Sequence, residues 1–272
     1  MGKTIIGWSD FSLNFWHGYT KVNDECEFCY MYRDKLRYGQ NPYQIVQGGE
    51  KYILNILSKV KPGQMIFTCS WSDFFIESAD NWRAWAWDII KSHPQFIWQI
   101  LTKRPHLIAQ RLPKDWGEGY PGVILCVSGG RQNSLNIKLS LLNEIPAWAK
   151  MVSIEPILER VSVIEAIEYS ASKSNGVYTA PDWVIVGGES GNDTGYFRYR
   201  PASLPWFDNL RTECRAIGVP LFVKQLGTHL AKELRLKDRH GANPDEFIAM
   251  RLDQQFPQIF KQYQMRVQNV RI

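Results

Sequence analysis

The sequence contains no long apolar run, and no stretch comes near the roughly 18 consecutive apolar residues that a membrane-spanning helix needs. We therefore expect no membrane span. Residues 1–7 contain neither an apolar run nor a small-residue cleavage site, so we also expect no secretory signal. No block of lysine and arginine resembles a nucleic-acid-binding arm. The formal net charge of +5 and the isoelectric point near 8.9 permit an anionic partner without requiring one.

Cysteine is scarce and odd in number, with five in 272 residues. A disulfide framework normally pairs an even number of cysteines in a secreted chain, so this count argues against one. We expect a reducing compartment, and the cytoplasm as the location. Cys126 lies in an apolar run and Cys214 in a helical pattern, and both are predicted to pack in the core.

Seven short apolar runs alternate with helical patterns at intervals of about 30 residues, which is typical of repeated βαβ units. The runs lack polar alternation, as expected for parallel strands that are buried on both faces. The predicted strands are residues 4–8, 65–69, 96–101, 123–127, 151–154, 183–186 and 220–223. The predicted helices are residues 43–60, 80–91, 107–112, 133–145, 161–169 and 203–217.

Distinctive polar residues follow nearly every predicted strand, which favours a (β/α) TIM-type barrel, complete or partial, over an open doubly wound sheet. In a barrel these residues converge at the carboxyl end of the strands, where barrel enzymes keep their chemistry. We predict a barrel domain of residues 1–227. No clear eighth strand follows Lys224, and the more charged residues 228–272 are predicted to be a C-terminal extension packed on the barrel.

The loop of residues 17–33 has the highest density of reactive side chains in the chain. Cys26 and Cys29 stand three positions apart in it, directly before a candidate helix. Such a pair can bind zinc, bind an iron-sulfur cluster or cycle as a disulfide, and the spacing alone does not choose among these roles.

Two further groups of residues follow predicted strands. The glycine-rich residues 187–191 can expose backbone N–H groups to a cofactor, although Gly-Gly after a strand is also an ordinary turn. Lys103, Arg104 and Lys224 could clamp an anionic substrate. Alternatively, these cations pair with the carboxylates that follow other strands, which are Asp73, Glu155 and Glu189.

A series of motifs in fixed order resembles a known family. The motifs are NFWHGYTKV (14–22), CEFCY (26–30), SWSDFF (70–75), LTKRP (101–105), SIEP (153–156), WVIVGGESG (183–191) and PLFVKQ (220–225). They are similar to those of the phage gp-thirty-seven/sixty-eight family, bacterial and phage proteins associated with three-Cys-motif partner proteins. The resemblance runs from about Trp8 to near Pro257.

The resemblance implies a barrel related to radical S-adenosylmethionine enzymes, with a 4Fe-4S cluster held by three cysteines and S-adenosylmethionine on the open iron. It implies the following roles for residues of this chain: Cys26 and Cys29 as metal ligands; Gly187, Gly188, Glu189, Ser190 and Ser128 as cofactor-binding; Glu155, Lys103 and Lys224 as catalytic; Asp73, Arg104, Gln225 and Trp71 as substrate-binding. The residues do not identify the substrate: the basic charge and the phage context suggest a nucleotide or nucleic acid, and a peptide carried by a partner is equally allowed. A three-Cys-motif partner protein is the partner that the resemblance implies.

The chain departs from the family pattern at one residue, because Tyr19 stands where the family has its first cysteine. A third ligand could be His17, Tyr19 as a phenolate or Cys69, or the cluster could be absent. Without the cluster, the chain would be a barrel that binds nucleic acid or a partner protein. A zinc site of Cys26, Cys29 and His17 is a third alternative.

Overall fold

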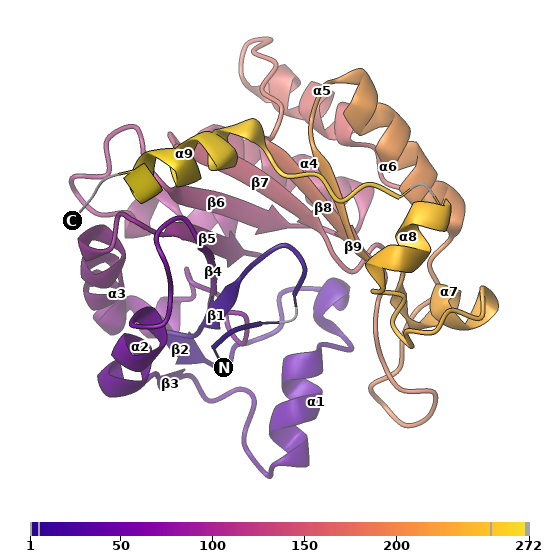
Figure 1. The fold of residues 1–272 in the computed structure, drawn as a ribbon, viewed down its shortest axis with the longest axis horizontal. Helices are drawn as coiled ribbons and strands as arrows, with labels where there is room; N and C mark the ends of the chain where they lie inside the picture. The colour runs from indigo at the N-terminus through magenta and orange to yellow at the C-terminus, as the bar shows by residue number, and fades with distance from the viewer. Residues whose placement is uncertain (1, 5, 251, 270–272) are drawn as a thin grey trace.

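A curled sheet of seven parallel strands forms the centre of the molecule (Figure 1). The computed structural model describes residues 2–4, 6–250 and 252–269. The sheet is a half-barrel rather than a complete ring, since its strands form a row in which β1 and β9 stand at the two ends. In order, the strands are β1 (Phe11–Leu13), β4 (Met65–Thr68), β5 (Ile97–Thr102), β6 (Val123–Ser128), β7 (Ala149–Ile154), β8 (Trp183–Gly187) and β9 (Leu221–Gln225).

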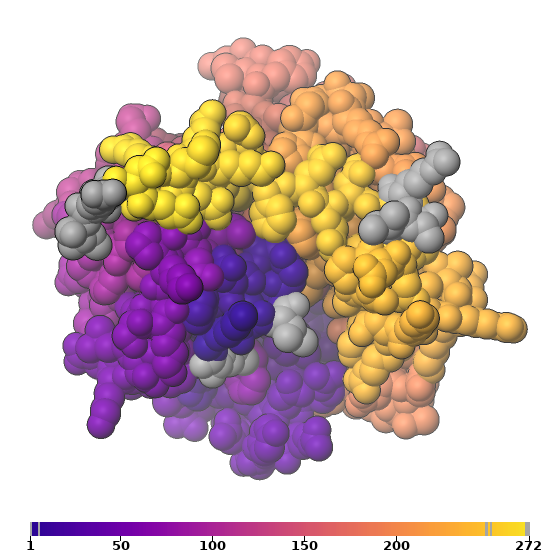
Figure 2. Space-filling model, viewed as in Figure 1, coloured from indigo at the N-terminus to yellow at the C-terminus, as the bar shows by residue number. Residues whose placement is uncertain are grey.

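The first strand of the sheet is not the predicted one. Residues 3, 4 and 6–8 form an amino-terminal strap instead; Ile5 lies outside the described residues. Lys3 pairs antiparallel with Phe11, and the Thr4 N–H donates to the Asp10 carbonyl (3.0 Å). Trp8, the last residue of the strap, is apolar because its side chain points into the half-barrel, where it packs on Phe67 and Trp183. Figure 2 shows this strap at the centre of one face, between the early elements and the C-terminal ones.

Helices cover the convex face of the sheet. They include α3 (Asp80–Ser92), α4 (Gln132–Asn143), α5 (Val163–Lys173) and α6 (Leu204–Ala216), close to the predicted bounds. Helix α5 starts where its sequence dictates, because the Ser162 side chain accepts from the Glu165 N–H, half of a capping box. The crossover from β5 to β6 contains only the 3-10 turns η3 (Pro105–Leu107) and η4 (Ala109–Arg111), where a helical piece was expected.

The helix predicted over residues 43–60 is wrong in its first half. Val46–Gln47 form strand β3, which pairs antiparallel with β2 (Trp16–His17), and only α2 (Glu50–Leu57) is helical. Gly48 lies between β3 and α2, where only glycine fits, because a Cβ there would stand 2.6 Å from the Asn14 carbonyl oxygen. The loop after β2 leads through η1 (Asp24–Cys26) to α1 (Tyr30–Arg37).

Two cores lie on the two faces of the sheet, as the period of two along each strand requires. The outer core packs between sheet and helices and includes Leu125, Val127 and the buried Cys214. The inner core fills the half-barrel and includes the buried Cys126, Met151 and Trp183. Both predictions that placed cysteines in the core are therefore confirmed.

The amino end of the half-barrel is covered by α9 (Gln258–Asn269), whereas α7 (Gly227–Glu233) and α8 (Pro244–Met250) lie at the carboxyl end, beyond β9. From α9, the Tyr263 hydroxyl donates to the Pro121 carbonyl (3.1 Å), and Phe260 packs on Trp148 and Trp183. Gln254 adds an antiparallel bridge to Phe222 of β9. Among the described helices, none has the length and apolar character needed to traverse a lipid bilayer.

Candidate functional site

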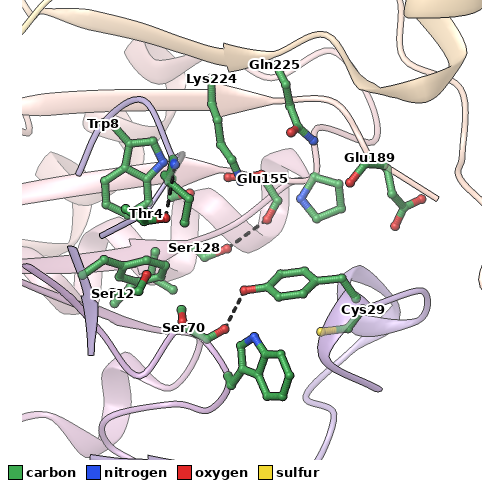
Figure 3. A pocket seen from close by; sticks show the side chains of 18 of the residues that line it. Thr4, Trp8, Ser12, Cys29, Ser70, Ser128, Glu155, Glu189, Lys224 and Gln225 are labelled. Atoms are coloured by element: carbon green, nitrogen blue, oxygen red, sulfur yellow. Dashed lines mark hydrogen bonds and ion pairs between the residues drawn. The ribbon is translucent and has the colours of Figure 1, made fainter. Parts of the chain in front are cut away.

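A cavity of about 890 Å³, here called the mouth cavity, lies at the carboxyl ends of the strands (Figure 3). Every residue to which the family resemblance assigns a role lines it except Gly187. These lining residues are Cys26, Cys29, Trp71, Asp73, Lys103, Arg104, Ser128, Glu155, Gly188, Glu189, Ser190, Lys224 and Gln225. They meet because parallel strands end at the same edge of the sheet.

The floor of the mouth cavity is built from side chains that point inward from the strands. Ser12 of β1, Phe67 of β4 and Ser153 of β7 line it, and Trp8 of the strap joins them. The indole N–H of Trp8 is buried and has no hydrogen-bond acceptor among the described residues. A buried donor without an acceptor is costly, so this group is available to a ligand.

Glu155 and Lys224 form an ion pair across the cavity, and about one fifth of each side chain is exposed. Gly187 makes room for this pair, because a Cβ there would stand 3.2 Å from the Glu155 carboxyl carbon. Ser128 donates to the Glu155 carbonyl (3.2 Å) and accepts from the Lys103 ammonium (2.8 Å). The Glu155–Pro156 peptide bond is cis.

Lys103 is held by a carboxylate that the sequence reasoning missed. Glu25, next to Cys26, has a fully buried side chain that contacts the ammonium groups of Lys138 (3.1 Å) and Lys103 (3.9 Å) and accepts from the Gly130 N–H (3.0 Å). Burial favours the neutral carboxyl, but Lys103 and Lys138 outweigh it and lower the pKa of Glu25 to about 2. Glu25 is therefore ionised at neutral pH.

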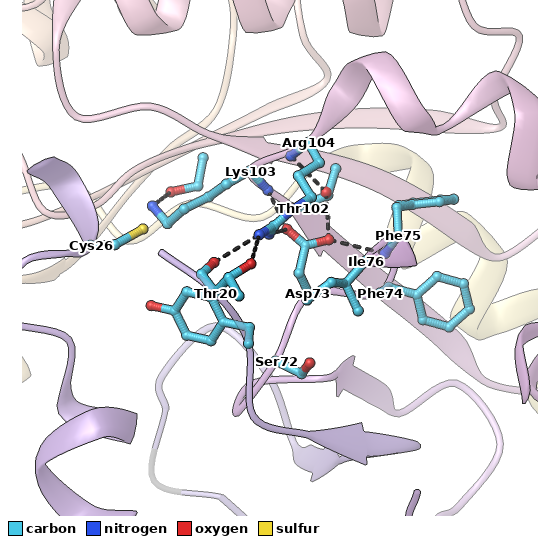
Figure 4. A network of polar contacts seen from close by, with 12 residues as sticks. Thr20, Cys26, Ser72, Asp73, Phe74, Phe75, Ile76, Thr102, Lys103 and Arg104 are labelled. Carbon is cyan, nitrogen blue, oxygen red and sulfur yellow. Dashed lines mark hydrogen bonds and ion pairs between the residues drawn. The ribbon is translucent and has the colours of Figure 1, made fainter. Parts of the chain in front are cut away.

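Asp73 and Arg104 are engaged with the protein rather than open to a ligand (Figure 4). Asp73 accepts from the Thr102 hydroxyl (2.7 Å) and the Lys103 N–H (2.9 Å), and its second oxygen meets Arg104 (3.2 Å). Arg104 in turn donates to the Thr20 carbonyl (2.7 Å). This network ties the cysteine loop to the ends of β4 and β5.

Glu189 and Gln225 also have protein partners. Arg200 makes a two-pronged contact with the Glu189 carboxylate (2.6 and 2.9 Å), and the Gln225 amide donates to the Gly188 carbonyl (2.8 Å). Gly188 is required by packing, because a Cβ there would stand 2.0 Å from the Leu226 carbonyl oxygen, and its N–H donates to the Gln225 carbonyl (3.0 Å). The sequence predicted that these cations pair with these carboxylates without assigning partners. Arg104 pairs with Asp73 and Lys224 with Glu155, whereas the side chains of Lys103 and Glu189 pair with residues outside the predicted set.

The cysteine loop brings Tyr19 against both Cys26 and Cys29. Burial, followed by the two thiols, raises the pKa of Tyr19 far above its ordinary value, so the phenol stays protonated beside them. Cys69 is buried at a left-handed φ of 53°, and burial raises the pKa of its thiol to about 12. His17 is half-buried, and burial followed by the charge of Lys35 lowers its pKa.

The residues present do not fit a 4Fe-4S cluster with one open iron, which needs three protein thiolates. Cys26 and Cys29 supply two, and the third place holds a protonated phenol. Within residues 2–4, 6–250 and 252–269, no three His, Cys, Asp or Glu side chains gather so that they could hold a metal ion. The zinc site with His17 is therefore not assembled in this part of the chain.

The sequence carried a signal for one of the missed residues. Lys138 stands on the apolar stripe of α4 with Leu135, Leu139 and Leu142, where a lysine needs a buried partner. The carboxylate of Glu25 is that partner. Nothing in the local pattern pointed to Trp8 as part of the cavity floor, because its run resembled a strand.

Fold and site together define a parallel α/β half-barrel protein with a ligand-sized cavity at the carboxyl ends of its strands. Residues 3–257 match the model of the family described as protein of unknown function DUF5131, and the chain belongs to this family. Neither the curated proteins nor the solved structures contain a match to the chain.

Proposed function

We propose that the chain binds a small polar molecule of nucleotide size in the mouth cavity and does so without an iron-sulfur cluster. One observation carries the proposal: Tyr19 lies against Cys26 and Cys29 in the third ligand position, while the predicted residues at the ends of the other strands line one cavity. The volume of about 890 Å³ is within the range of small-molecule sites, roughly 300–1,000 Å³.

The lining of the cavity supports a ligand with a flat ring and polar edges. Aromatic side chains of Trp8, Phe28, Tyr30, Phe67 and Trp71 offer ring faces. The basic and acidic lining residues balance, which argues against a polyanion such as nucleic acid inside the cavity. They are Lys3, Arg33, Lys103, Arg104 and Lys224 against Glu25, Asp73, Glu155, Glu189 and Asp238.

Three polar groups suit direct contact with the ligand. The ammonium groups of Lys103 and Lys224 are partly exposed and can meet a phosphate or carboxylate. Glu155 accepts a hydrogen bond from Lys224. A ligand that takes the place of Lys224 beside this carboxylate can exchange a proton with it. The unpartnered N–H of Trp8 can donate to a carbonyl or ring nitrogen of the ligand.

Binding of adenosine monophosphate and of adenosine, measured by calorimetry, tests this proposal. We expect binding by the unaltered protein and at least a tenfold loss of phosphate-ester affinity, about 1.4 kcal/mol, in Lys224→Met. Lys114→Met is the matched control, since Lys114 is exposed and does not line the cavity. If neither compound binds, or if both lysine variants behave alike, the proposed ligand class is wrong.

A second candidate is the radical S-adenosylmethionine enzyme of complete or partial TIM-type fold that the family resemblance implies. In its favour, Cys26 and Cys29 line the same cavity as Gly188, Glu155 and Lys224. A three-Cys-motif partner protein, nucleic acid at the rim and a cytoplasmic location belong to the same set of proposals. This candidate needs a third ligand, so a cluster on the unaltered chain would favour it over the first.

A further inference from the structure

The backbone holds Cys26 and Cys29 in a closed turn. The Cys29 N–H donates to the Cys26 carbonyl (3.3 Å), directly after the 3-10 turn of η1. A turn closed from the first to the fourth residue keeps their Cα atoms within about 7 Å, and disulfides span about 4.4–6.8 Å between Cα atoms. The backbone therefore already has the spacing that a bond between the two sulfurs requires.

One side chain lies close to both cysteines. Tyr19, which is 7% exposed, is near enough to Cys26 and Cys29 that both thiols raise the pKa of its hydroxyl. The two cysteines therefore flank the same buried side chain.

The loop is anchored on both sides of the pair. Glu25, just before Cys26, is fixed by Lys138 and the Gly130 N–H, and Arg104 holds the Thr20 carbonyl. The Tyr32 hydroxyl donates to the Tyr19 carbonyl. These contacts hold the loop in place and with it the backbone spacing of the two cysteines.

Reagents can reach the pair through the mouth cavity, which both cysteines line. Cys29 is partly exposed whereas Cys26 is 1% exposed, so a dissolved oxidant meets Cys29 first. Cys126 and Cys214 are buried in the two cores. Cys69 lines the cavity but is 2% exposed.

We propose that Cys26 and Cys29 form a redox-active dithiol that closes to a disulfide. With a low-molecular-weight disulfide as oxidant, the Cys29 sulfur loses its proton, attacks one sulfur and releases one thiol, leaving a mixed disulfide. The Cys26 sulfur then loses its proton, attacks the Cys29 sulfur and releases the second thiol. The two protein thiols are oxidised by two electrons, and the small disulfide is reduced to two thiols. This proposal does not depend on nucleotide binding. Because both cysteines line the mouth cavity, the reaction would change part of its wall from two thiols to one disulfide.

The test equilibrates the folded, reduced full chain with oxidised and reduced glutathione, traps free thiols with an alkylating agent and maps the peptides by mass spectrometry. We expect a Cys26–Cys29 disulfide, loss of two of the five free thiols, and recovery of both on return to reduced glutathione. Cys26→Ser should stop at a glutathione adduct on Cys29, because the resolving thiol is missing. Cys69→Ser is the matched control and should form the disulfide like the unaltered chain.

Three results would overturn the proposal. The first is a folded protein, checked by circular dichroism, that keeps all five thiols in oxidised glutathione. The second is a bond between Cys29 and Cys69. The third is iron or zinc bound to Cys26 and Cys29 in protein purified without oxygen, since a metal would replace the dithiol. The calorimetric test of nucleotide binding uses reduced protein, so its outcome stands apart from this one.

Discussion

The two ends of the half-barrel are built from the same strands but have opposite character. Toward the amino end, the inward side chains are large and apolar, such as Ile124, Met151 and Trp183, and α9 covers them. Toward the carboxyl end, the inward positions of the same strands carry Ser128, Glu155 and other polar groups around the mouth cavity. We therefore expect the side chains at the amino end to contribute most to the free energy of unfolding, whereas those at the carboxyl end line a cavity that a ligand can enter.

The largest loss of stability is expected at the sealed end. Phe260 of α9 is 1% exposed and packs on Trp148 and Trp183, so Phe260→Ala should lower the free energy of unfolding by about 3–5 kcal/mol. Met265 on the same helix is 55% exposed, and Met265→Ala should change it by less than about 0.5 kcal/mol. Urea unfolding followed by circular dichroism measures both. Equal changes of the unfolding free energy in the two variants would show that the packing of α9 on the amino end does not stabilise the fold.

Glu25 lies at the open, carboxyl end but stabilises the fold rather than contacting a ligand, because its buried carboxylate pairs with Lys138 and Lys103. Glu25→Gln should cost about 3 kcal/mol at neutral pH, since it leaves Lys138 buried without a counter-charge. The folded-state pKa of about 2 lies below the ordinary value of 4.5, so the stabilisation is present above pH 4.5 and is lost as the pH falls toward 2. The gap between the unaltered chain and Glu25→Gln should therefore narrow at low pH.

The matched control for Glu25 is Glu118→Gln, an exposed carboxylate, which should leave the unfolding free energy unchanged at every pH. A gap between the unaltered chain and Glu25→Gln that stays constant down to pH 2 would contradict the assigned role of this carboxylate.

Gly188 separates packing from ligand binding. Gly188→Ala should destabilise the chain by about 1–3 kcal/mol, because its Cβ would overlap the Leu226 carbonyl at 2.0 Å. Gly49→Ala should be tolerated, since no atom lies within 4 Å of a Cβ there. Thermal unfolding of the two variants distinguishes these effects. If Gly188→Ala is as stable as the unaltered chain, packing does not require this glycine, and ligand binding is the only role left for it.

The smallest effect on stability is expected at Lys224. Its ion pair with Glu155 is partly exposed, so Lys224→Met should change the unfolding free energy by no more than about 1 kcal/mol while it removes ligand affinity. Chemical denaturation beside calorimetry measures the two effects in one variant. A large loss of stability would mean that Lys224 belongs to the structural framework instead.

Strands that are buried on both faces were predictable from the sequence. Runs such as Val123–Ser128 lie close to their predicted positions because burial on both faces makes every residue of the run apolar. The first strand, Phe11–Leu13, was missed because three residues form no recognisable apolar run. The strap was predicted as the first strand instead, because its apolar residues resemble a buried strand, whereas Trp8 is apolar because it packs on Phe67 inside the half-barrel. Whether the row of strands closes into a ring depends on contacts distant in sequence, which no local pattern contains.

The residues that line the site were largely predictable, but their partners were not. The ends of parallel strands converge whatever the loops do, so Lys103, Glu155 and Lys224 meet at one cavity. Which carboxylate takes which cation depends on distances across the barrel. For this reason Lys103 was not matched with Glu25, nor Glu189 with Arg200.

We expect this half-barrel to bind its ligand without an iron-sulfur cluster, and an iron and sulfide assay tests this most directly. The unaltered chain and Tyr19→Cys are purified without oxygen, incubated with iron and sulfide, desalted and assayed. We expect no retained iron or sulfide on the unaltered chain, and about four of each per chain in Tyr19→Cys, where a third thiol joins Cys26 and Cys29. About four iron and four sulfide on the unaltered chain would contradict a function without a cluster.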